Sequence, residues 1–396
     1  GDNVAGNQVL LEGTPVTQIA GTVSANALGL IGSLGSLSTA QFGADPSVVA
    51  GFTQWTRAAG PLSVGTVTVA GRQAAGASGT NLTFQATGGR LSIDAPLSAS
   101  ASVDLSAGGG IDLNAAVQGT AVRLSTAADV AESVTGSVSA QSLRVDAGTG
   151  ASLDSVANDV DILAANVSVP GANFIYRDAD GFTVGLVSGM DGVSTIGGNI
   201  SLTASGTGNI SLARSLSTGG AGASSAALGT VLLDTSAGGG VSESGSAAIV
   251  ADRLEVRAAA AVNLSNSGNN VSSLAGNIGN LNAGFAYTDA DSLNVTVVGA
   301  TSGISTNGGN ISLTALAFGS INLLRDLSTG GAGATSATTG TVALDASTGG
   351  VMEVGAAVVA DKLAVSAQSS SILANSGNNV ATLAASLSGL GASFSY

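Results

Sequence analysis

The sequence contains no cysteine and no histidine, and it is poor in charged and aromatic residues. Of its 396 residues, 9% are charged and 3% are aromatic. A Ser-His-Asp or Cys-His nucleophile, a zinc cluster and a disulfide framework each require Cys or His. The two absences therefore exclude these catalytic and metal-binding classes.

The charge balance narrows the range of partners. The chain has 11 basic and 25 acidic residues, a net charge of −14 at pH 7, so we expect neither nucleic acid nor an anionic membrane surface as a partner. Its hydrophobic content of 44% argues against disorder, because disordered chains combine low hydrophobicity with high charge. The uncharged segment 13–44 is interrupted by polar residues and glycines, so we expect no transmembrane span in it.

Internal repetition is the strongest signal in the sequence. The matching motifs are GGNISLTA at 197–204 and 308–315, LSTGGAGA at 216–223 and 327–334, NSGNNV at 266–271 and 375–380, and FIYRDAD at 174–180 with FAYTDAD at 285–291. Three of these pairs share one offset, and NSGNNV returns slightly earlier. The unit is therefore about 110 residues long and occurs nearly three times.

The repeats predict one continuous array. Its parts are 1–77 as divergent N-terminal coils, 78–196 as repeat 1, 197–307 as repeat 2 and 308–396 as a truncated repeat 3. Both ends cut through the pattern, so we expect the segment to belong to a longer array.

Within a unit the local period is two, which is typical of β-strands. Ile200 and Leu202 fall on one face of such a strand, while Ser201 and Thr203 fall on the other. Gly-Gly, Ser-Gly and Asn-Asn pairs separate these runs and favour turns. We therefore predict an all-β fold, a parallel β-helix (β-solenoid) with about five coils per repeat and aliphatic side chains stacked inside.

One stretch resembles a known family. FIYRDADGFTVG at 174–185, followed by GGNISLT at 197–203, resembles the repeats of filamentous-haemagglutinin-like bacterial exoproteins, which leave the cell by two-partner secretion or as autotransporters. The resemblance covers about residues 62–396. It implies a right-handed parallel β-helix, an extracellular or cell-surface location, and adhesion or surface scaffolding.

Two sets of acidic residues are candidates for chemistry. Asp178 and Asp180, with Asp289 and Asp291 in the next repeat, are weak calcium candidates, because neither turn supplies the further ligands of known calcium loops. Glu132, Glu243 and Glu353 occupy corresponding positions in the three repeats. A catalytic carboxylate pair occurs once in a chain, so this recurrence predicts solvated turn residues and no catalytic site.

The few aromatic residues also recur at intervals. They are Trp55, Tyr176, Tyr287 and Tyr396. Exposed rings could stack on sugars, whereas buried rings would be packing anchors, one per repeat, and we favour the anchors.

Together these patterns predict a non-enzymatic extracellular solenoid with no cofactor, a stiff rod for adhesion or scaffolding. Its expected partners are glycans or proteins of host or neighbouring cells, or copies of itself. Two alternatives stay open. A self-assembling subunit of a filament, sheath or surface layer would leave strand edges available for pairing. A β-helical carbohydrate-active enzyme would need a groove whose acidic residues do not recur.

Overall fold

The structure, a computed structural model, describes residues 4–17, 23–36, 40–49, 55–58, 60–69, 72–346 and 348–396, with side chains over 60–66, 68, 75–346 and 348–396. Every regular element in these residues is a β-strand, which confirms the all-β prediction. No helix in this part of the chain is long and apolar enough to cross a membrane.

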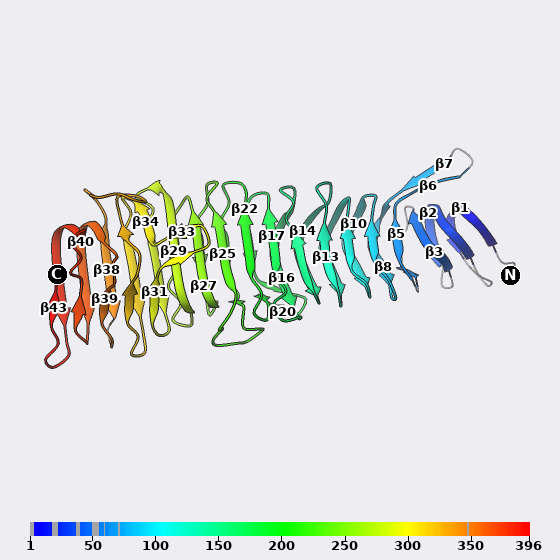
Figure 1. Cartoon of the computed structure of the whole chain (residues 1–396). Coiled ribbons are helices and arrows are strands. Elements are labelled where there is room, and N and C mark those ends of the chain that lie inside the picture. The colour runs from blue at the N-terminus through cyan, green and yellow to red at the C-terminus, as the bar shows by residue number, and fades with distance from the viewer. Residues whose placement is uncertain are drawn as a thin grey trace. The chain divides into compact units, whose positions relative to one another are not determined.

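Contacts divide the chain into two compact units. The N-terminal unit is Gly1–Ala179 with Val187–Met190, and the C-terminal unit is Asp180–Leu186 with Asp191–Tyr396. Within each unit, strands one coil apart lie side by side (Figure 1), as β12 does with β14 and β25 with β27, and these ladders are parallel.

The N-terminal unit contains β1 (Val4–Thr17), β2 (Val23–Ser36), β3 (Ala40–Val49), β4 (Trp55–Ala58), β5 (Leu62–Val64), β6 (Thr66–Val69), β7 (Arg72–Ala75), β8 (Ala77–Ala86), β9 (Leu91–Ile93), β10 (Leu97–Ala107), β11 (Ile111–Leu113), β12 (Ala116–Thr126), β13 (Asp129–Glu132), β14 (Ser137–Ala147), β15 (Gly150–Leu153), β16 (Asp159–Val167) and β17 (Phe174–Asp178). The division between the units runs through β19 (Leu186–Val187) and β20 (Met190–Asp191).

The C-terminal unit contains β18 (Phe182–Val184), β21 (Val193–Ser194), β22 (Ile200–Ala204), β23 (Ile210–Leu212), β24 (Leu216–Ser217), β25 (Thr230–Thr235), β26 (Val241–Glu243), β27 (Ile249–Ala258), β28 (Val262–Leu264), β29 (Asn270–Leu281), β30 (Phe285–Asp289), β31 (Leu293–Val295), β32 (Val297–Val298), β33 (Thr301–Ser302), β34 (Ile304–Asn307), β35 (Ile311–Ala315), β36 (Ile321–Leu323), β37 (Leu327–Ser328), β38 (Thr341–Ala346), β39 (Val351–Glu353), β40 (Val358–Ala367), β41 (Ser371–Ile372), β42 (Asn379–Leu387) and β43 (Phe394–Ser395).

In the N-terminal unit, aliphatic residues stack in a column through consecutive coils. The ladder partners are, in order, Leu82, Val103, Val122, Leu143 and Leu163. All five are buried. The column returns after nearly the same length of chain each time, about 20 residues, and parallel neighbours at one-coil intervals are the pairing expected of a β-solenoid.

The C-terminal unit has the same kind of columns with longer and less regular coils. One column runs through Ile200, Val231, Leu254, Leu274 and Val295. A neighbouring column runs through Ile210, Val241, Val262, Phe285, Ile311, Val342, Leu363 and Leu383. Its shortest step leads from Leu363 to Leu383, and its longest steps lead from Ile210 to Val241 and from Ile311 to Val342. Coil length is therefore not constant along the unit.

The sequence repeat does not coincide with a whole number of coils. Four coils carry the first column from Ile200 to Val295, and the next sequence repeat begins when the following coil is only partly complete. Ile311, the sequence equivalent of Ile200, therefore lies in the column of Ile210. Equivalent residues of successive repeats consequently occupy neighbouring columns.

The alternation predicted for the strands is present. Ile200, Leu202, Ile311 and Leu313 are fully buried, whereas Ser201 and Ser312 are partly exposed. Side chains of a strand point to opposite sides, so one side fills the coil and the other faces solvent.

Candidate functional site

The recurring glutamates belong to a polar cluster in the wall of the coil, which we call the Glu–Asn clamp. The Asn269 side-chain amide donates to Glu243 Oε2 and to the Leu264 carbonyl, both at 3.1 Å. Its Oδ1 accepts the N–H of Ile249 at 2.7 Å. Glu243 Oε2 also accepts the N–H of Asn266 at 3.1 Å. The clamp thus links two adjacent coils through backbone groups that the ladders leave unpaired.

The clamp has two further copies. Asn158 donates to Glu132 at 3.0 Å, and Asn378 donates to Glu353 at 3.1 Å. The prediction that these glutamates are solvated turn residues was wrong, because each is partly buried by the next coil and holds its asparagine. A recurring structural requirement therefore explains why they recur.

Each clamp glutamate keeps one oxygen, Oε1, buried without a hydrogen-bond partner. Burial raises the pKa of Glu132 and of Glu353. It raises the pKa of Glu243 to about 7, against the lowering effect of its hydrogen bonds from Asn269 and Asn266. The cause is desolvation, because burial disfavours the charged carboxylate relative to the neutral acid.

The inner aspartates of the two acidic turns are also internal. Asp289 is fully buried and accepts hydrogen bonds from Tyr287 Oη at 2.7 Å and from the N–H of Val271 at 3.0 Å. Burial raises the pKa of Asp289 to about 6. Asp178 is equally buried and accepts the corresponding hydrogen bonds from Tyr176 and Val160.

The outer aspartates of these turns, Asp180 and Asp291, are exposed. Since Asp289 lies inside the coil and Asp291 outside, this turn does not present its two carboxylates to one external ion. Among the residues that the structure describes, no group of three or more Asp and Glu could hold a metal ion.

Two of the three tyrosines, Tyr176 and Tyr287, follow the interpretation as packing anchors. Tyr176 and Tyr287 are among the largest fully buried side chains, and burial raises their pKa well above the usual value. Tyr396 is 46% exposed. The side chain of Trp55 lies outside the described residues. Tyr176 and Tyr287 cannot offer ring faces to a sugar.

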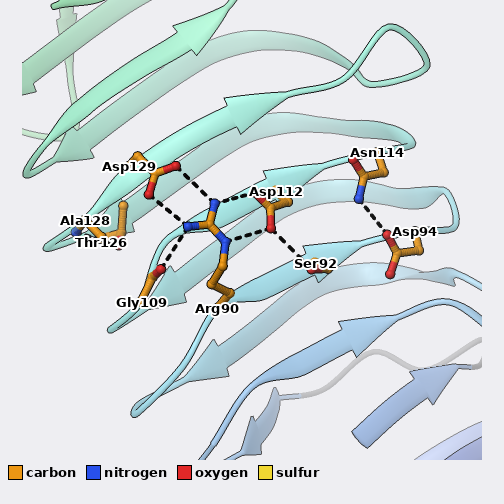
Figure 2. A network of polar contacts seen from close by, with 9 residues as sticks. All are labelled: Arg90, Ser92, Asp94, Gly109, Asp112, Asn114, Thr126, Ala128 and Asp129. Carbon is orange, nitrogen blue, oxygen red and sulfur yellow. Dashed lines mark hydrogen bonds and ion pairs between the residues drawn. The ribbon is translucent and has the colours of Figure 1, made fainter. Parts of the chain in front are cut away.

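The outside of the N-terminal unit carries a cross-coil ion-pair network (Figure 2). Arg90 donates from Nε to Asp112 at 2.8 Å and from Nη1 to Asp129 at 2.9 Å, and Nη1 also reaches the Gly109 carbonyl at 3.1 Å. The hydrogen bond from Arg90 lowers the pKa of Asp129. Because two carboxylates and a carbonyl engage this guanidinium, the network connects three coils and serves the fold.

Two outward loops recur with the sequence repeat. They are residues 219–229 and 330–340, and their patterns of exposure are identical. Asn270 donates to the Ser224 carbonyl at 3.1 Å, and Asn379 donates to the Thr335 carbonyl at 2.8 Å. Each loop is therefore held against the coil at the same point.

Antiparallel hairpins also leave the coil. One is 297–302, in which β32 and β33 pair antiparallel, and an earlier one joins β6 and β7. They return to the coil at Gly303 and Gly76, both with positive φ, and a Cβ there would lie 2.2 Å and 1.9 Å from a backbone carbonyl oxygen. Glycine is required at both positions because the backbones approach so closely.

The 297–302 hairpin is fastened by a buried acid. Glu255 Oε1 accepts hydrogen bonds from Thr301 Oγ1 at 2.8 Å and from the Ala300 N–H at 3.2 Å. One repeat earlier, Arg144 occupies the equivalent position and donates to the Ser188 carbonyl at 2.7 Å. Opposite charges thus perform the same task, which explains why sequence comparison of the repeats missed both anchors.

The N-terminal unit carries an open groove of about 390 Å³, which we call the corner groove. It follows the bend of four strands, β10, β12, β14 and β16. Its lining is Ala99, Ser100, Gln118, Gly119, Thr120, Ser139, Ala140, Gln141, Asp159 and Asp161. Small buried residues such as Gly119 and Ala140 form its floor, and polar side chains form its two edges.

Comparisons with known proteins name no relative. No family model, no curated protein and no solved structure matches this chain. The function must therefore be argued from the residues described above.

Proposed function

We propose that this chain is a non-enzymatic segment of a secreted bacterial surface exoprotein, a β-solenoid scaffold that supports adhesion through repeated outward loops. The observation that carries the proposal is that the recurring polar residues fall into two sets, one inside the coil and one on exposed loops. Those inside, the Glu–Asn clamps, are engaged by the fold, whereas the loops 219–229 and 330–340 are exposed and held in the same way.

The register of the C-terminal unit gives the loops different positions around the coil. Val231, shortly after the first loop, lies in the column of Ile200, whereas Val342, after the second loop, lies in the column of Ile210. The same loop therefore emerges from neighbouring corners. Two copies of the same loop on one chain favour multivalent binding, in which weak contacts add through effective concentration.

The proposal is tested with the chain coupled to beads and flowed over cultured cells and over cell-wall material. Three variants replace residues 220–228, residues 331–339, or both, by scrambled sequences of the same composition. We expect each single replacement to weaken retention, because the chain then binds through one loop only, and the double replacement to reduce retention to that of an unrelated protein.

A matched control scrambles residues 66–75, which lie outside the recurring loops. Adhesion through the loops would be refuted if beads carrying the unmodified chain were retained no better than beads carrying an unrelated protein. Unchanged retention of the double variant would refute it as well. If the unmodified chain released reducing sugar from the cell-wall material, the chain would instead be a β-helical carbohydrate-active enzyme.

A further inference from the structure

We infer that the corner groove of the N-terminal unit binds a neutral oligosaccharide chain, a ligand class that deepens the proposed adhesive function and rests on it. The groove crosses four consecutive coils, and adjacent strands lie about 4.8 Å apart. This spacing is comparable with the length of one pyranose residue in an extended glycan. A sugar chain lying along the groove would therefore meet a similar set of polar groups at each coil.

The two edges of the groove are built in register. Gln118, Ser139 and Asp159 are ladder partners on consecutive strands and form one edge. Two residues further along two of those strands, Gln141 and Asp161 lie on the other edge. Because side chains at positions i and i+2 of a strand share a face, both edges point outward over the small residues between them.

These edge side chains are available to a ligand. In the described part of the chain, no hydrogen bond or ion pair engages the side chain of Gln118, Ser139, Gln141, Asp159 or Asp161. Elsewhere on this unit, outward polar groups such as Arg90 and Asp112 are paired with one another. Polar groups that converge on one concavity fix the orientation of a bound ligand and give specificity.

The same corner is covered in the C-terminal unit. Ser217, Val250 and Asn270 are successive ladder partners there, and Asn270 is the repeat equivalent of Asp159. The loop 219–229 leaves the coil after Thr218 and folds back until its Ser224 carbonyl accepts a hydrogen bond from the Asn270 amide. The N-terminal unit has no loop at this bend, since β12 passes through it as one strand.

The exchange of Asn for Asp changes what the corner can hold. An asparagine amide can donate to a carbonyl of a peptide loop, whereas a carboxylate only accepts hydrogen bonds. Asp159 and Asp161 therefore favour an occupant that presents donors, and sugar hydroxyl groups satisfy this requirement. The lining contains no basic residue and the chain is strongly acidic, so sulfated or uronic-acid glycans are disfavoured.

The experiment titrates cellohexaose, N-acetylchitohexaose and a heparin hexasaccharide into the full chain, with saturation-transfer NMR as the readout. We expect one of the neutral hexasaccharides to bind and heparin to give no signal. The Asp159→Asn/Asp161→Asn variant should bind at least about tenfold more weakly, because hydrogen bonds to charged groups are lost. A second variant, Gln118→Ala/Gln141→Ala, should also bind more weakly.

The matched control, Asp252→Asn/Asp361→Asn, removes the same charge at residues of the C-terminal unit that do not line the groove, and it should bind like the unmodified chain. Absence of binding by both neutral hexasaccharides, or equal binding by the groove and control variants, would overturn the inference. Preferred binding of heparin, or of a peptide with the sequence of residues 219–229, would overturn it as well.

The bead assay separates this inference from the proposed function. If the groove variants still adhere in the bead assay and the unmodified chain binds no saccharide in solution, saccharide binding by the groove is refuted and adhesion through the loops is not. Saccharide binding by a chain whose beads are not retained refutes adhesion and leaves the groove in place.

Discussion

In the N-terminal unit, the column from Leu82 to Leu163 takes nearly equal steps, whereas the steps of the column from Ile210 to Leu383 in the C-terminal unit are unequal. The additional residues lie in outward excursions: each of the two longest steps, Ile210 to Val241 and Ile311 to Val342, contains one of the two long loops. The interior of the two units is built alike, from alternating buried aliphatic residues closed by a Glu–Asn clamp. Coil length is therefore free to vary at the corners, while the columns and clamps are not.

This difference has a consequence for binding. Where a coil is short, its corner stays open as a polar groove, and where a coil is long, its own loop covers the corner. The two units thus offer two kinds of surface from one interior plan. Insertions are tolerated at such corners because the energetic cost of a longer loop rises slowly with its length.

The largest effect is expected in the shared interior. Ile311→Ala should lower the free energy of unfolding by about 2–5 kcal/mol, since it leaves a cavity in the column. Ser312→Ala, one residue along, should stay within about 0.5 kcal/mol. Hydrogen exchange should show lost protection at the column neighbours Phe285 and Val342 and none at Ile200. Loss of protection at Ile200 equal to that at Phe285 would contradict the columns.

Variants of the clamp asparagines test whether the Glu–Asn clamp contributes equally to the stability of the two units. Asn269→Ala leaves the Ile249 N–H without its acceptor and should destabilise by about 2–3 kcal/mol in urea unfolding. Asn158→Ala should have the same cost in the N-terminal unit, because its hydrogen bonds are the same. Asn270→Ala is the control, a partly exposed neighbour whose loss should remain below about 1 kcal/mol. A large difference between Asn158→Ala and Asn269→Ala would mean that the long loops contribute to the clamp.

The point at which a hairpin returns to the coil is sensitive to a single added methyl group. Gly303→Ala places a Cβ 2.2 Å from the Asp326 carbonyl oxygen and should cost about 2 kcal/mol in thermal or urea unfolding. Gly333→Ala has nearly the same φ, +71° against +70°, but no neighbouring atom within 4 Å, so about 1 kcal/mol of backbone strain remains. Equal costs for the two variants would show that the close approach to Asp326 is relieved by a small shift.

The smallest expected effects are opposite responses to pH. Arg90 lowers the pKa of Asp129, so the folded state binds this proton less tightly than the unfolded state, and the stabilisation is lost as the pH falls below about 4. Burial raises the pKa of Glu243 to about 7, so the folded state binds its proton more tightly. That contribution is present below about pH 4.5 and is lost as the pH rises through about 7.

Urea unfolding at about pH 3.5, 5 and 7.5 distinguishes the two groups. The Glu243→Gln variant should lose part of the decline in stability between pH 5 and 7.5. The Arg90→Gln variant should be destabilised by less than about 1 kcal/mol at pH 7.5, because its ion pairs are partly exposed, and by less again at pH 3.5. An unchanged pH profile in the Glu243→Gln variant would mean that this carboxyl is solvated.

The residues of the candidate site were only partly predictable. The recurrence of Glu132, Glu243 and Glu353 indicated that they are structural, but their burial followed from the next coil, which comes into contact only when the chain has completed a full turn. The corner groove combines residues from four strands, none of which is unusual alone. One signal was present in the sequence: Asp159 and Asp161 stand where the next repeat has Asn270 and Ser272.

By itself, the sequence determined the all-β class, the inward side of each strand and the length of the repeat, because these follow from local periodicity and self-similarity. The tertiary structure decided which residues stack on one another. Ile200 stacks on Val231, and Ile311 joins the column of Ile210, because pairing between coils depends on how many residues each excursion takes. The alternation within a strand has the same period in a short coil and in a long coil. It therefore does not determine which residues of adjacent coils become ladder partners.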